Sequence, residues 1–481
     1  MSIMPNIIHW FRRDLRLADN PAFTAASQVS QGAVVPLFIL DDNVLQSSRT
    51  SAARVVFMLE SLRALDASLR AHGSRLIIRH GSPEQCIAQV IDETDAVGVY
   101  WNRDYSPFAR QRDTIIEKML RGRGVDVHTH KDAVIWEIDE ILTKNNTPYT
   151  VYTPYARQWR ARVEANPVLL AEAVLPGLQP VPDTLSSSAI PLAAELGFAT
   201  QQLLPSGGEQ VGLEQLNTFV HAQNAPGIHG YAEQRNFPAK PGTSRLSPYL
   251  RFGCIAPQTC LRAAHKAGFQ QHGSETWVGE LAWRDFYYQI LYHFPHVLQR
   301  SFKSDYDKIE WDNNEVFFAA WCEGRTGYPI VDAAMRQLTA EAWMHNRARM
   351  IVASFLTKDL LIDWRWGERY FMQQLVDGDH ASNNGGWQWA AGTGTDAQPY
   401  FRIFNPISQS EKFDLQGDYI RHYVPELQHV SASYIHTPWN MSQELQRQVG
   451  IHIGRDYPMP IVDHAMQRQR ALELYKRARA E

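Results

Sequence analysis

The chain has 481 residues, which at roughly 100–200 residues per domain predicts about two to four domains and excludes a single small module. Hydrophobic residues make up 44% of the chain and charged residues 20%, which excludes a disordered protein. With 47 Lys and Arg against 51 Asp and Glu, the formal net charge is −4. A histone-like binder is therefore excluded, and any contact with nucleic acid must come from a local basic face.

The cysteines and the apolar stretches of the sequence indicate in which cellular compartment the protein is expected. Cys86, Cys254, Cys260 and Cys322 form no CxxC pair and no Cys/His cluster at metal-ligand spacing, so the sequence predicts neither a disulfide framework nor a metal site. A reducing, cytoplasmic compartment is therefore expected. The first residues do not resemble a signal peptide, and the longest apolar stretch, 33–40, is too short to span a bilayer, so we expect neither secretion nor a membrane.

The first 135 residues alternate short apolar runs with segments of helical periodicity, such as 52–69 and 83–93. The predicted strands are 7–11, 33–40, 75–80, 96–101 and 125–130. This alternation predicts βαβ units and an α/β domain with a doubly wound parallel sheet over residues 1–135. The first strand is followed by RRDLRL and not by a GxGxxG turn, so the domain lacks the dinucleotide fingerprint of NAD enzymes.

The rest of the chain loses its strand signals. Residues 136–208 have a looser pattern, rich in proline and serine at 175–191, and are predicted to be a linker. Residues 209–481 are predicted to form an all-helical domain, because helical runs follow one another with short breaks. The clearest of these runs are 257–268, 274–293, 329–341 and 346–361. Ten of the 14 tryptophans lie at or after Trp277, an uncommon concentration in one half of a chain.

Four side chains fall on one face of the helix predicted at 274–293. Glu280, Trp283, Arg284 and Tyr287 stand at positions i, i+3, i+4 and i+7. A flat indole beside a hydrogen-bonding carboxylate is typical of a pocket for a planar heterocycle. The alternative is a solvated amphipathic helix with one ion pair, and the segment alone leaves both interpretations open.

Two segments that contain glycine could contact a ligand closely. GTSRLSPY (242–249) offers hydroxyls and a helix start that can bind phosphate, although a plain helix cap is the alternative. DGDHASNNGGWQWAAGTGTD (377–396) combines glycines with acids, amides and two indoles that can contact the edge of a ring. The alternative there is a structural glycine-rich loop, and the acids lack the spacing of an EF-hand.

Basic residues among aromatic and amide side chains predict a face for nucleic acid, because arginines contact phosphates while rings stack on bases. The residues concerned are Arg235, Asn346, Arg347, Arg349, Met350 and Arg402. Taken alone, each arginine is better explained as a solvated side chain and His345 as a structural histidine, so the hypothesis depends on their occurring together. The sequence contains no Ser/His/Asp order, no P-loop and no zinc deaminase signature.

Taken together, the motifs resemble those of the DNA photolyase/cryptochrome family over almost the whole chain. They are WFRRDLRLADNPAF, TSRLSPYL, GELAWRDFY, GYPIVDAAMRQL, WMHNRARMIVASFLTKDLLIDW and NNGGWQWAAGTGTDAQPYFRIFNP, in the family's order. The resemblance implies an α/β antenna domain, a linker and an all-helical domain that binds FAD. It also implies light-driven repair of cyclobutane pyrimidine dimers by electron transfer from excited reduced FAD, as in class I photolyases.

Carried over position by position, the resemblance implies a set of residues around FAD. Those expected to bind the cofactor are Tyr231, Thr243, Ser244, Arg245, Leu246, Ser247, Trp277, Glu280, Arg284, Asn346, Arg349, Asp377, Asp379 and Asn383. The segment from Thr243 to Ser247 would lie on the phosphates. Asn383 matches the position that faces flavin N5, where plant cryptochromes have Asp. Arg349 and Asp377 would form an ion pair near the isoalloxazine ring.

The resemblance also implies a lesion pocket and an electron path. The catalytic residues that it implies are Glu280, Trp283, Met350, Asn383 and Trp389. The DNA-binding residues are Arg235, Glu280, Trp283, Asn346, Arg347, Met350, Trp389 and Arg402, and the electron-transfer residues are Trp387, Trp364 and Trp311. Trp283 and Trp389 would flank a flipped-out dimer to which Glu280 hydrogen-bonds. Met350 stands where (6-4) photolyases have histidine, which favours the cyclobutane-dimer branch.

The antenna chromophore and the partners complete the expectations. Folate-binding members carry an Asn-Glu pair where this chain has Phe108 and Ala109, whereas LDDNVLQ, SAARV and YWNRDYSPFARQRD are closer to members that use 8-hydroxy-5-deazaflavin. We therefore expect that chromophore rather than methenyltetrahydrofolate. We also expect a monomer that acts on UV-damaged DNA, double- or single-stranded. The alternative is a cryptochrome, a blue-light receptor without repair; such proteins often have a long C-terminal extension, whereas this chain ends in RALELYKRARAE.

Overall fold

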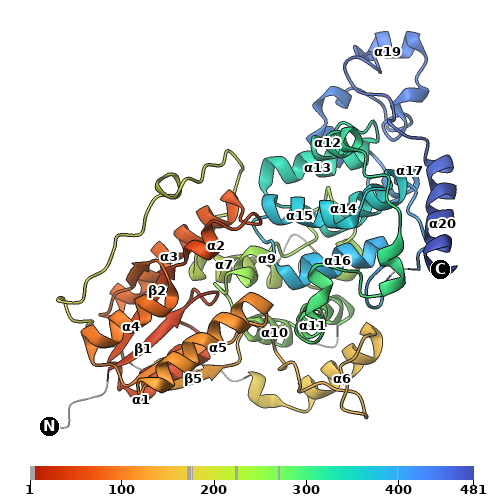
Figure 1. Ribbon diagram of the computed structural model, residues 1–481. Coiled ribbons are helices and arrows are strands. Elements are labelled where there is room, and N and C mark those ends of the chain that lie inside the picture. The colour runs from red at the N-terminus through yellow and green to blue at the C-terminus, as the bar shows by residue number, and fades with distance from the viewer. Residues whose placement is uncertain are drawn as a thin grey trace.

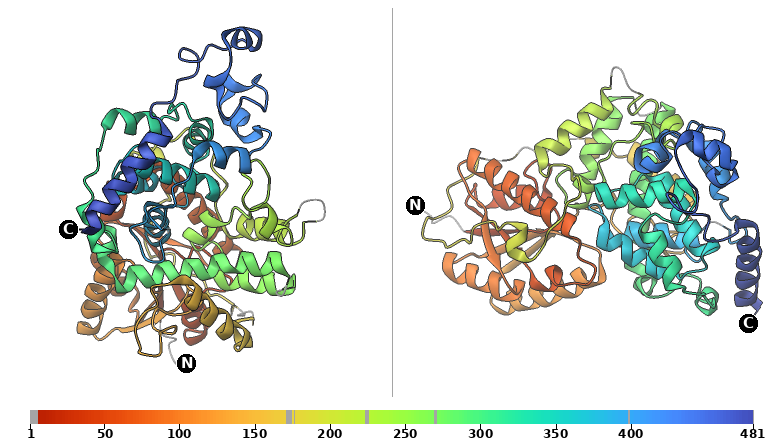
Figure 2. Two further views of the ribbon diagram at one scale, coloured as in Figure 1. Left: turned by 90° about the vertical axis from the view of Figure 1, so that its right-hand side faces the viewer. Right: turned by 90° about the horizontal axis from the view of Figure 1, so that it is seen from above.

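The computed structural model describes residues 6–170, 175, 177–222, 226–268, 271–397 and 399–480. An N-terminal α/β part lies against a C-terminal helical part (Figure 1). The predicted fold class is confirmed, since one five-stranded parallel sheet is followed by helices. Seen from above, the α/β part and the helical part lie side by side, and the C-terminal helix lies at the far end from the sheet (Figure 2).

The sheet has the strand order β3-β2-β1-β4-β5, and all neighbours are parallel. Its strands are β1 Ile7–Phe11, β2 Val34–Leu40, β3 Ile77–His80, β4 Gly98–Asn102 and β5 Asp126–His130. Strands β1 and β2 pair from Ile7 with Val34 to Phe11 with Phe38 and are buried along their whole length. Continuous burial is expected here because the crossover helices of parallel strands cover both faces.

Alternate residues of β1 point into two different cores. Phe11 packs in a core with residues of α1 and α3, and Trp10 packs in a core with residues of α4 and α5. The helices of this part are α1 Pro21–Val29, α2 Asp42–Leu45, α3 Ala52–Ala71, α4 Pro83–Thr94 and α5 Pro107–Gly122. The sheet is therefore doubly wound, as predicted.

The region 136–208 contains short helices and an extended segment that follows the outside of the sheet. The helices are α6 Tyr152–Glu164 and the 3₁₀ turns η1 Pro167–Leu170 and η2 Ala193–Leu196. Ser187 Oγ accepts a hydrogen bond from the Ile78 N–H (2.9 Å), and the Ser188 N–H donates to the Ile78 carbonyl (3.0 Å). These bonds satisfy the free edge of β3, which would otherwise be open to pairing with another chain.

Asp285 fixes the start of this region to the helical part. One carboxylate oxygen accepts hydrogen bonds from the N–H groups of Ile135 (3.0 Å) and Trp136 (3.2 Å) and from Trp159 Nε1 (2.8 Å). Burial raises the pKa of Asp285 to about 6, and these donors oppose the shift. A carboxyl inside helix α11, His272–His293, thus positions backbone and side-chain groups more than a hundred residues away.

After β5 the described residues form helices and no further strand beyond isolated bridges. The α-helices are α7 Glu209–Val220, α8 Tyr231–Gln234, α9 Ser247–Arg251, α10 Pro257–Lys266, α11 His272–His293, α12 Glu315–Cys322, α13 Pro329–Glu341, α14 Asn346–Ser354, α15 Trp364–Gln374, α16 His380–Ala391, α17 Pro406–Phe413, α18 Asp418–Tyr423, α19 Gln443–Val449 and α20 His464–Ala480. The 3₁₀ turns are η3 Pro295–Leu298, η4 Ser304–Lys308, η6 Pro425–Leu427 and η7 Pro438–Asn440.

The helix predicted at 346–361 is α14 only as far as Ser354 and continues as a π-helix, Phe355–Asp359. The side chain of Lys358 in this π-helix is buried and donates to the Ala391 carbonyl at the end of α16 (2.8 Å). Helix α16 also packs against α11, α14 and α15. These four helices carry many of the residues that the sequence analysis assigned to the cofactor, the lesion and the electron path.

Candidate active site

Glu280 on α11 lies in a partly buried polar cluster with two residues from around α8. Arg235 Nη1 donates to Glu280 Oε1 at 2.5 Å, and Tyr231 hydrogen-bonds to the same carboxyl group. Desolvation raises the pKa of Glu280, and the Arg235 guanidinium opposes that shift. Arg235 also lies over the ring of Tyr231, 5.4 Å from its centroid. The structure therefore brings together three residues that the sequence analysis assigned to this site.

Trp283, one helical turn after Glu280, stacks on Tyr152 at the start of α6. The two ring centroids are 3.5 Å apart and the planes differ by 7°. The Tyr152 hydroxyl donates to the Gly279 carbonyl (2.9 Å), which holds the phenol ring in place. The sequence analysis did not single out Tyr152, because a tyrosine in the linker has no spacing relation to α11.

Arg349 on α14 and Asp377 before α16 form the predicted ion pair. Arg349 Nη2 lies 2.8 Å from Asp377 Oδ2, and its Nε donates to the Met344 carbonyl (2.8 Å). Asp377 is buried, and its second oxygen, Oδ1, has no hydrogen-bond partner. A buried carboxylate oxygen without a partner is costly, so this atom is available to a ligand that donates a hydrogen bond.

Asn383 on α16 is held by α15. Its amide nitrogen donates to the carbonyl oxygen of Glu368 (3.0 Å) and to Glu368 Oε1 (3.2 Å). The same carboxylate accepts from Arg49 Nη1 at 3.0 Å, which comes from the loop between α2 and α3. One turn after Asn383, a Cβ added at Gly386 would meet no atom within 4 Å, so this face of α16 borders open space.

Asp379 caps α16 and joins the two parts of the molecule. One of its carboxylate oxygens accepts from the Ala381 and Ser382 N–H groups, and the other accepts from Arg13 Nη2 (2.8 Å) and the Tyr288 hydroxyl (2.7 Å). Arg284 likewise makes structural contacts, donating to the carbonyl of Ala133 and lying over the Tyr288 ring at 4.8 Å.

The segment 243–247, predicted to lie on phosphates, is bordered by two indoles. Trp277 Nε1 donates to Ser244 Oγ and Trp343 Nε1 donates to Ser247 Oγ, both at 3.3 Å. Arg245 adopts a left-handed backbone conformation (φ 50°) and lies over Trp343 at 4.3 Å. Within the segment, the side chain of Leu246 is buried and those of Arg245 and Ser247 are exposed.

The remaining predicted residues lie on and around α14. Asn346 is exposed and its Nδ2 lies 3.9 Å from Met350 Sδ. Arg347 Nη2 donates to Asn236 Oδ1 (2.7 Å), next to Arg235, while His345 caps the helix. Trp389, predicted for the lesion pocket, lies on α16 and is partly buried. Arg402, predicted for the DNA face, follows α16 and is exposed.

The three tryptophans of the predicted electron path lie on neighbouring segments. A Cβ added at Gly367 would lie 2.1 Å from the Trp387 ring, so Trp387 packs directly on the helical turn that begins with Trp364. The Asp312 N–H donates to the Leu361 carbonyl (2.8 Å), which places Trp311 beside the start of the same helix. Trp387 and Trp364 are buried and Trp311 is partly exposed, so the series leads outward.

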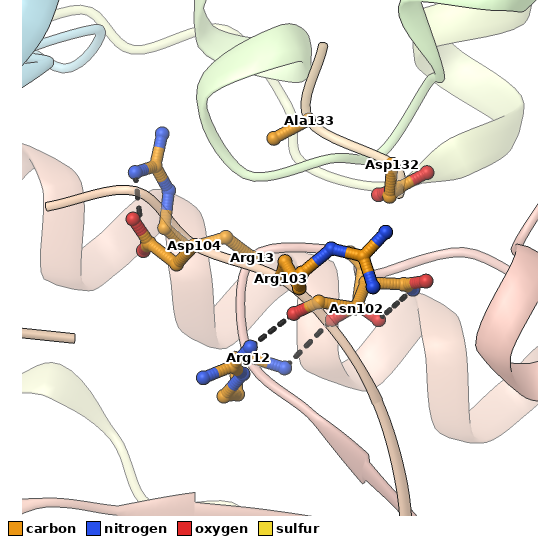
Figure 3. Close-up of a pocket in the computed structure, with 8 residues that line it drawn as sticks. Arg12, Arg13, Asn102, Arg103, Asp104, Asp132 and Ala133 are labelled. Atoms are coloured by element: carbon orange, nitrogen blue, oxygen red, sulfur yellow. Dashed lines mark hydrogen bonds and ion pairs between the residues drawn. The ribbon is translucent and has the colours of Figure 1, made fainter. Parts of the chain in front are cut away.

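The crevice beyond the carboxyl ends of β1 and β4 is filled by side chains. The strand order reverses here, which is where open α/β sheets usually bind ligands. The cavity has a volume of only about 20 Å³, room for about one water molecule. Arg13 pairs with Asp104 across it, and Arg12 donates to the Asn102 carbonyl (Figure 3). In this chain the crevice serves mainly to connect the two parts of the molecule.

Comparison with known proteins identifies the family. The model of the FAD binding domain of DNA photolyase matches residues 277–477, and the DNA photolyase model matches residues 7–176. Two curated relatives are named deoxyribodipyrimidine photo-lyase. The protein from Halobacterium salinarum is 42% identical over 98% of this chain and 99% of its own length. The protein from a Synechococcus strain is 42% identical over 98% of this chain and 97% of its own length. The chain belongs to the DNA photolyase family.

Solved structures agree with this assignment. A bacterial class III photolyase from Agrobacterium tumefaciens has a TM-score of 0.90 and 39% identity, over 100% of this photolyase-family chain and 99% of that one. An archaeal photolyase from Sulfolobus tokodaii, solved with two FAD molecules, has a TM-score of 0.83 and 35% identity, over 98% of this chain and 100% of that one. The similarity covers both the α/β part and the helical part.

The described residues contain no helix that is long and apolar enough to cross a membrane. Across the same part of the chain, no group of three or more His, Cys, Asp or Glu residues could hold a metal ion. Within the site, sequence analysis missed Tyr152, Glu368 and Arg49. Each of them reaches a predicted residue from another helix or loop, and no periodicity or motif marks such a contact.

Proposed function

We propose that this chain is a deoxyribodipyrimidine photo-lyase, which uses light to repair cyclobutane pyrimidine dimers by electron transfer from excited reduced FAD. The observation that carries the proposal is full-length similarity, because an enzyme of that name matches 98% of the chain at 42% identity. The five proposed catalytic residues, Glu280, Trp283, Met350, Asn383 and Trp389, lie on α11, α14 and α16, and α16 packs against the other two.

The proposed lesion pocket lies between α11 and α16. A dimer that leaves the base stack would lie against Trp283 and Trp389, and Glu280 would hydrogen-bond to it. The stack of Tyr152 on Trp283 supports this role, since it fixes the plane of the indole before the lesion arrives. Flipping costs a few kcal/mol for an intact base and less for a poorly paired dimer, which favours damaged DNA.

The rest of the proposed DNA face surrounds this pocket. Asn346, Arg347 and Met350 would form its rim on α14, with Arg235 and Arg402 directed to the phosphates. The Arg347 contact with Asn236 supports a common face, because it joins the start of α14 to the residue that follows Arg235. Since the net charge of the whole chain is −4, this local cluster must supply the attraction for DNA.

The residues of the helical part fit FAD. Asp377 Oδ1 is buried without a partner, and Gly386 borders open space, so the site offers both an acceptor and room for a ring. The proposed cofactor residues are Tyr231, Thr243, Ser244, Arg245, Leu246, Ser247, Trp277, Glu280, Arg284, Asn346, Arg349, Asp377, Asp379 and Asn383. When bound, FAD supplies the light-driven electron transfer, and the protein supplies placement and hydrogen bonds.

In this arrangement each part of the protein has a separate task. Arg349 Nη2 pairs with Asp377 Oδ2 at 2.8 Å, which leaves Oδ1 to accept a hydrogen bond from the ring system. Asn383 offers an amide at the position assigned to flavin N5. Trp387, Trp364 and Trp311 would carry electrons inward to re-reduce the cofactor, and their packing on one another's segments supports that path.

We further propose that the substrate is the cyclobutane dimer and not the (6-4) lesion, because Met350 has no acid–base chemistry to offer where (6-4) enzymes carry histidine. Within the family we propose class I, on the match of the motifs. The solved structure with a TM-score of 0.90 is a class III photolyase, so the class I proposal rests on the motifs and not on the fold.

For the antenna chromophore we propose 8-hydroxy-5-deazaflavin rather than methenyltetrahydrofolate. Arg54 and Arg251 lie between the two parts of the molecule, where each donates to a carbonyl of the segment before α16. Burial lowers the pKa of Arg54 to about 9 and that of Arg251 to about 10, and Arg251 Nη1 has no partner. Buried guanidinium groups of this kind suit the ionised hydroxyl of a deazaflavin. Mass spectrometry of the extracted chromophore tests this choice.

We also propose a monomer in the cytoplasm. The cysteines support a reducing compartment, since Cys86, Cys254 and Cys260 are buried as free thiols and Cys322 is partly buried. The extended linker segment supports the monomer, because it covers the edge of β3 that could pair with a second copy. Light scattering at several protein concentrations tests the oligomeric state.

The decisive experiment for the activity is blue-light repair of an oligonucleotide with one cyclobutane thymine dimer. A (6-4) lesion and a dark sample serve as controls. Light-dependent restoration of the cyclobutane substrate alone is expected. Repair of neither lesion by protein with bound, photoreducible FAD would refute the proposed activity, and repair of the (6-4) lesion would refute the argument from Met350.

A further inference from the structure

We propose that Arg49, a residue of the α/β part, is a positioning residue for the repair reaction: by pairing with Glu368 it fixes which end of the Asn383 amide faces the flavin. The inference deepens the proposed function and rests on it, because Asn383 is assigned to flavin N5 there. Arg49 lies outside every motif of the sequence analysis, and its link to the site comes only from the contacts of the folded chain.

The contact crosses the boundary between the two parts of the molecule. Arg49 Nη1 lies 3.0 Å from Glu368 Oε1, whose side chain is 2% exposed, whereas the Arg49 side chain is 28% exposed. The loop that carries Arg49 is held against α15 and its C-terminal end by neighbouring bonds. Gln373 Nε2 donates to the Ser48 carbonyl (3.0 Å), and Arg54 Nη1 donates to the Leu375 carbonyl (2.8 Å).

Glu368 in turn decides the orientation of Asn383. Two acceptors face the amide, the backbone oxygen of Glu368 at 3.0 Å and its Oε1 at 3.2 Å. Only the NH₂ end of an amide can donate to two acceptors, so the nitrogen must face α15. The oxygen Oδ1 is then directed away from Glu368, and Asn383 offers an acceptor to a donor such as a flavin N5–H.

The backbone oxygen accepts in either protonation state of Glu368, but the side-chain half of this preference requires an ionised carboxylate. A neutral carboxylic acid carries an O–H donor, which would pair equally well with Oδ1 and allow the amide to turn. Burial raises the pKa of Glu368, and Arg49 is the strongest influence that lowers it, followed by Asn383 and Arg369. His380 on α16 does not supply a second cation, because burial lowers its pKa to about 4.

Arg49 therefore supplies the charge that most favours ionised Glu368, and through it the orientation of Asn383 in which the nitrogen faces α15. The Glu368 side chain is only 2% exposed, so burial opposes its ionised form. When the Arg49 charge is removed, the pKa of Glu368 rises, and the carboxyl is protonated at a higher pH. A hydrogen bond to the reduced flavin would then be lost in proportion to the protonated fraction. The signature is a pH dependence that the unsubstituted protein does not show.

The test follows air oxidation of the reduced flavin in the dark, by absorbance, from about pH 6 to about pH 9. Arg49→Met and Arg49→Gln remove the charge, Arg49→Lys retains it, and Arg369→Met removes an exposed charge on the same helix as a matched control. For Arg49→Met and Arg49→Gln we expect oxidation about tenfold faster near pH 6 and a return toward the normal rate near pH 9, the effect of one hydrogen bond. Arg49→Lys should behave like the unsubstituted protein, and Arg369→Met should show a smaller effect than the two neutral variants, because Arg369 lowers the pKa of Glu368 less than Arg49 does.

Asn383→Ser separates this inference from the function on which it rests. If Asn383→Ser accelerates oxidation while the two neutral variants keep the flat pH profile of the unsubstituted protein, the role of Arg49 is overturned and the site assignment stands. If Asn383→Ser has no effect, the assignment of Asn383 to the flavin is overturned together with this inference. FAD content and thermal melting of each variant show that the flavin is compared in folded protein.

Discussion

Replacing Arg13 by Met should loosen the contact between the α/β part and the helical part. Arg13 follows β1, and its guanidinium donates to the Tyr288 hydroxyl (2.7 Å), to Asp379 Oδ2 (2.8 Å) and to the Arg251 carbonyl (3.2 Å). A weaker ion pair joins it to Asp104 at 3.4 Å. Methionine preserves much of the side-chain volume but leaves both carboxylates without this cation.

The magnitude follows from burial. Removing one partner of a buried ion pair costs about 3–5 kcal/mol, because the other charge is left uncompensated. The side chains of Arg13 and Asp379 are 21% and 11% exposed, so we expect the lower end, about 3 kcal/mol. At about 2–4 °C per kcal/mol for a domain of this size, the melting temperature should fall by roughly 6–12 °C.

Thermal unfolding followed by circular dichroism near pH 7 measures this effect, with Arg13→Lys as a control that keeps the charge and loses the fork of donors. A double-mutant cycle with Asp379→Asn gives the coupling of the pair. The pKa values of Asp379 and Asp104 are held well below their ordinary value by Arg13, so their contribution is present above about pH 4 and is lost as the pH falls further. The difference between Arg13→Met and the unsubstituted protein should therefore shrink in acid. A melting temperature within about 1 °C of normal at pH 7 would refute the reasoning.

The other predictions concern the site. Glu280→Ala should lower the repair yield about tenfold or more with FAD still bound, as expected for a hydrogen bond to a charged group, and an unchanged yield would remove its role. Trp387→Phe should block photoreduction of oxidised FAD but spare repair by chemically reduced enzyme, so normal photoreduction would contradict the path. Tyr152→Leu should weaken binding of dimer-containing DNA more than binding of intact DNA, since it removes the support of Trp283; equal losses would argue against the stack. Raising the salt concentration should weaken DNA binding steeply, and a flat response would exclude the basic face.

Much of the fold could be predicted because its signals are local. The five strand predictions agree with the structure to within a few residues, since the apolar runs of a parallel sheet are continuous and bounded by helical periodicity. The helical run predicted at 346–361 is confirmed as far as Asp359, but its second part, Phe355–Asp359, is a π-helix and not a continued α-helix. The buried contact of Lys358 with Ala391 lies there, and a contact between distant segments leaves no periodic signal.

Part of the candidate site could likewise be predicted from local signals, and part of it could not. Its residue types could be predicted from the motifs, and the structure forms the expected Arg349–Asp377 pair and brings Arg235 to Glu280. The residues that orient these site residues could not be predicted from the motifs. Tyr152 reaches Trp283 from the linker, and Arg49 reaches Glu368 from the α/β part, each across more than a hundred residues.

By itself, the sequence determined the order of the elements, the two-part organisation, and the side chains that carry the chemistry, because helical and strand periods and motif spacing are properties of neighbouring residues. Only the tertiary structure decided the ionisation and orientation of those side chains. A pKa depends on burial and on the nearest charges, and the direction of an amide depends on which acceptors face it. Both are set by segments that meet only when the chain has folded, as Arg49, Glu368 and Asn383 do here.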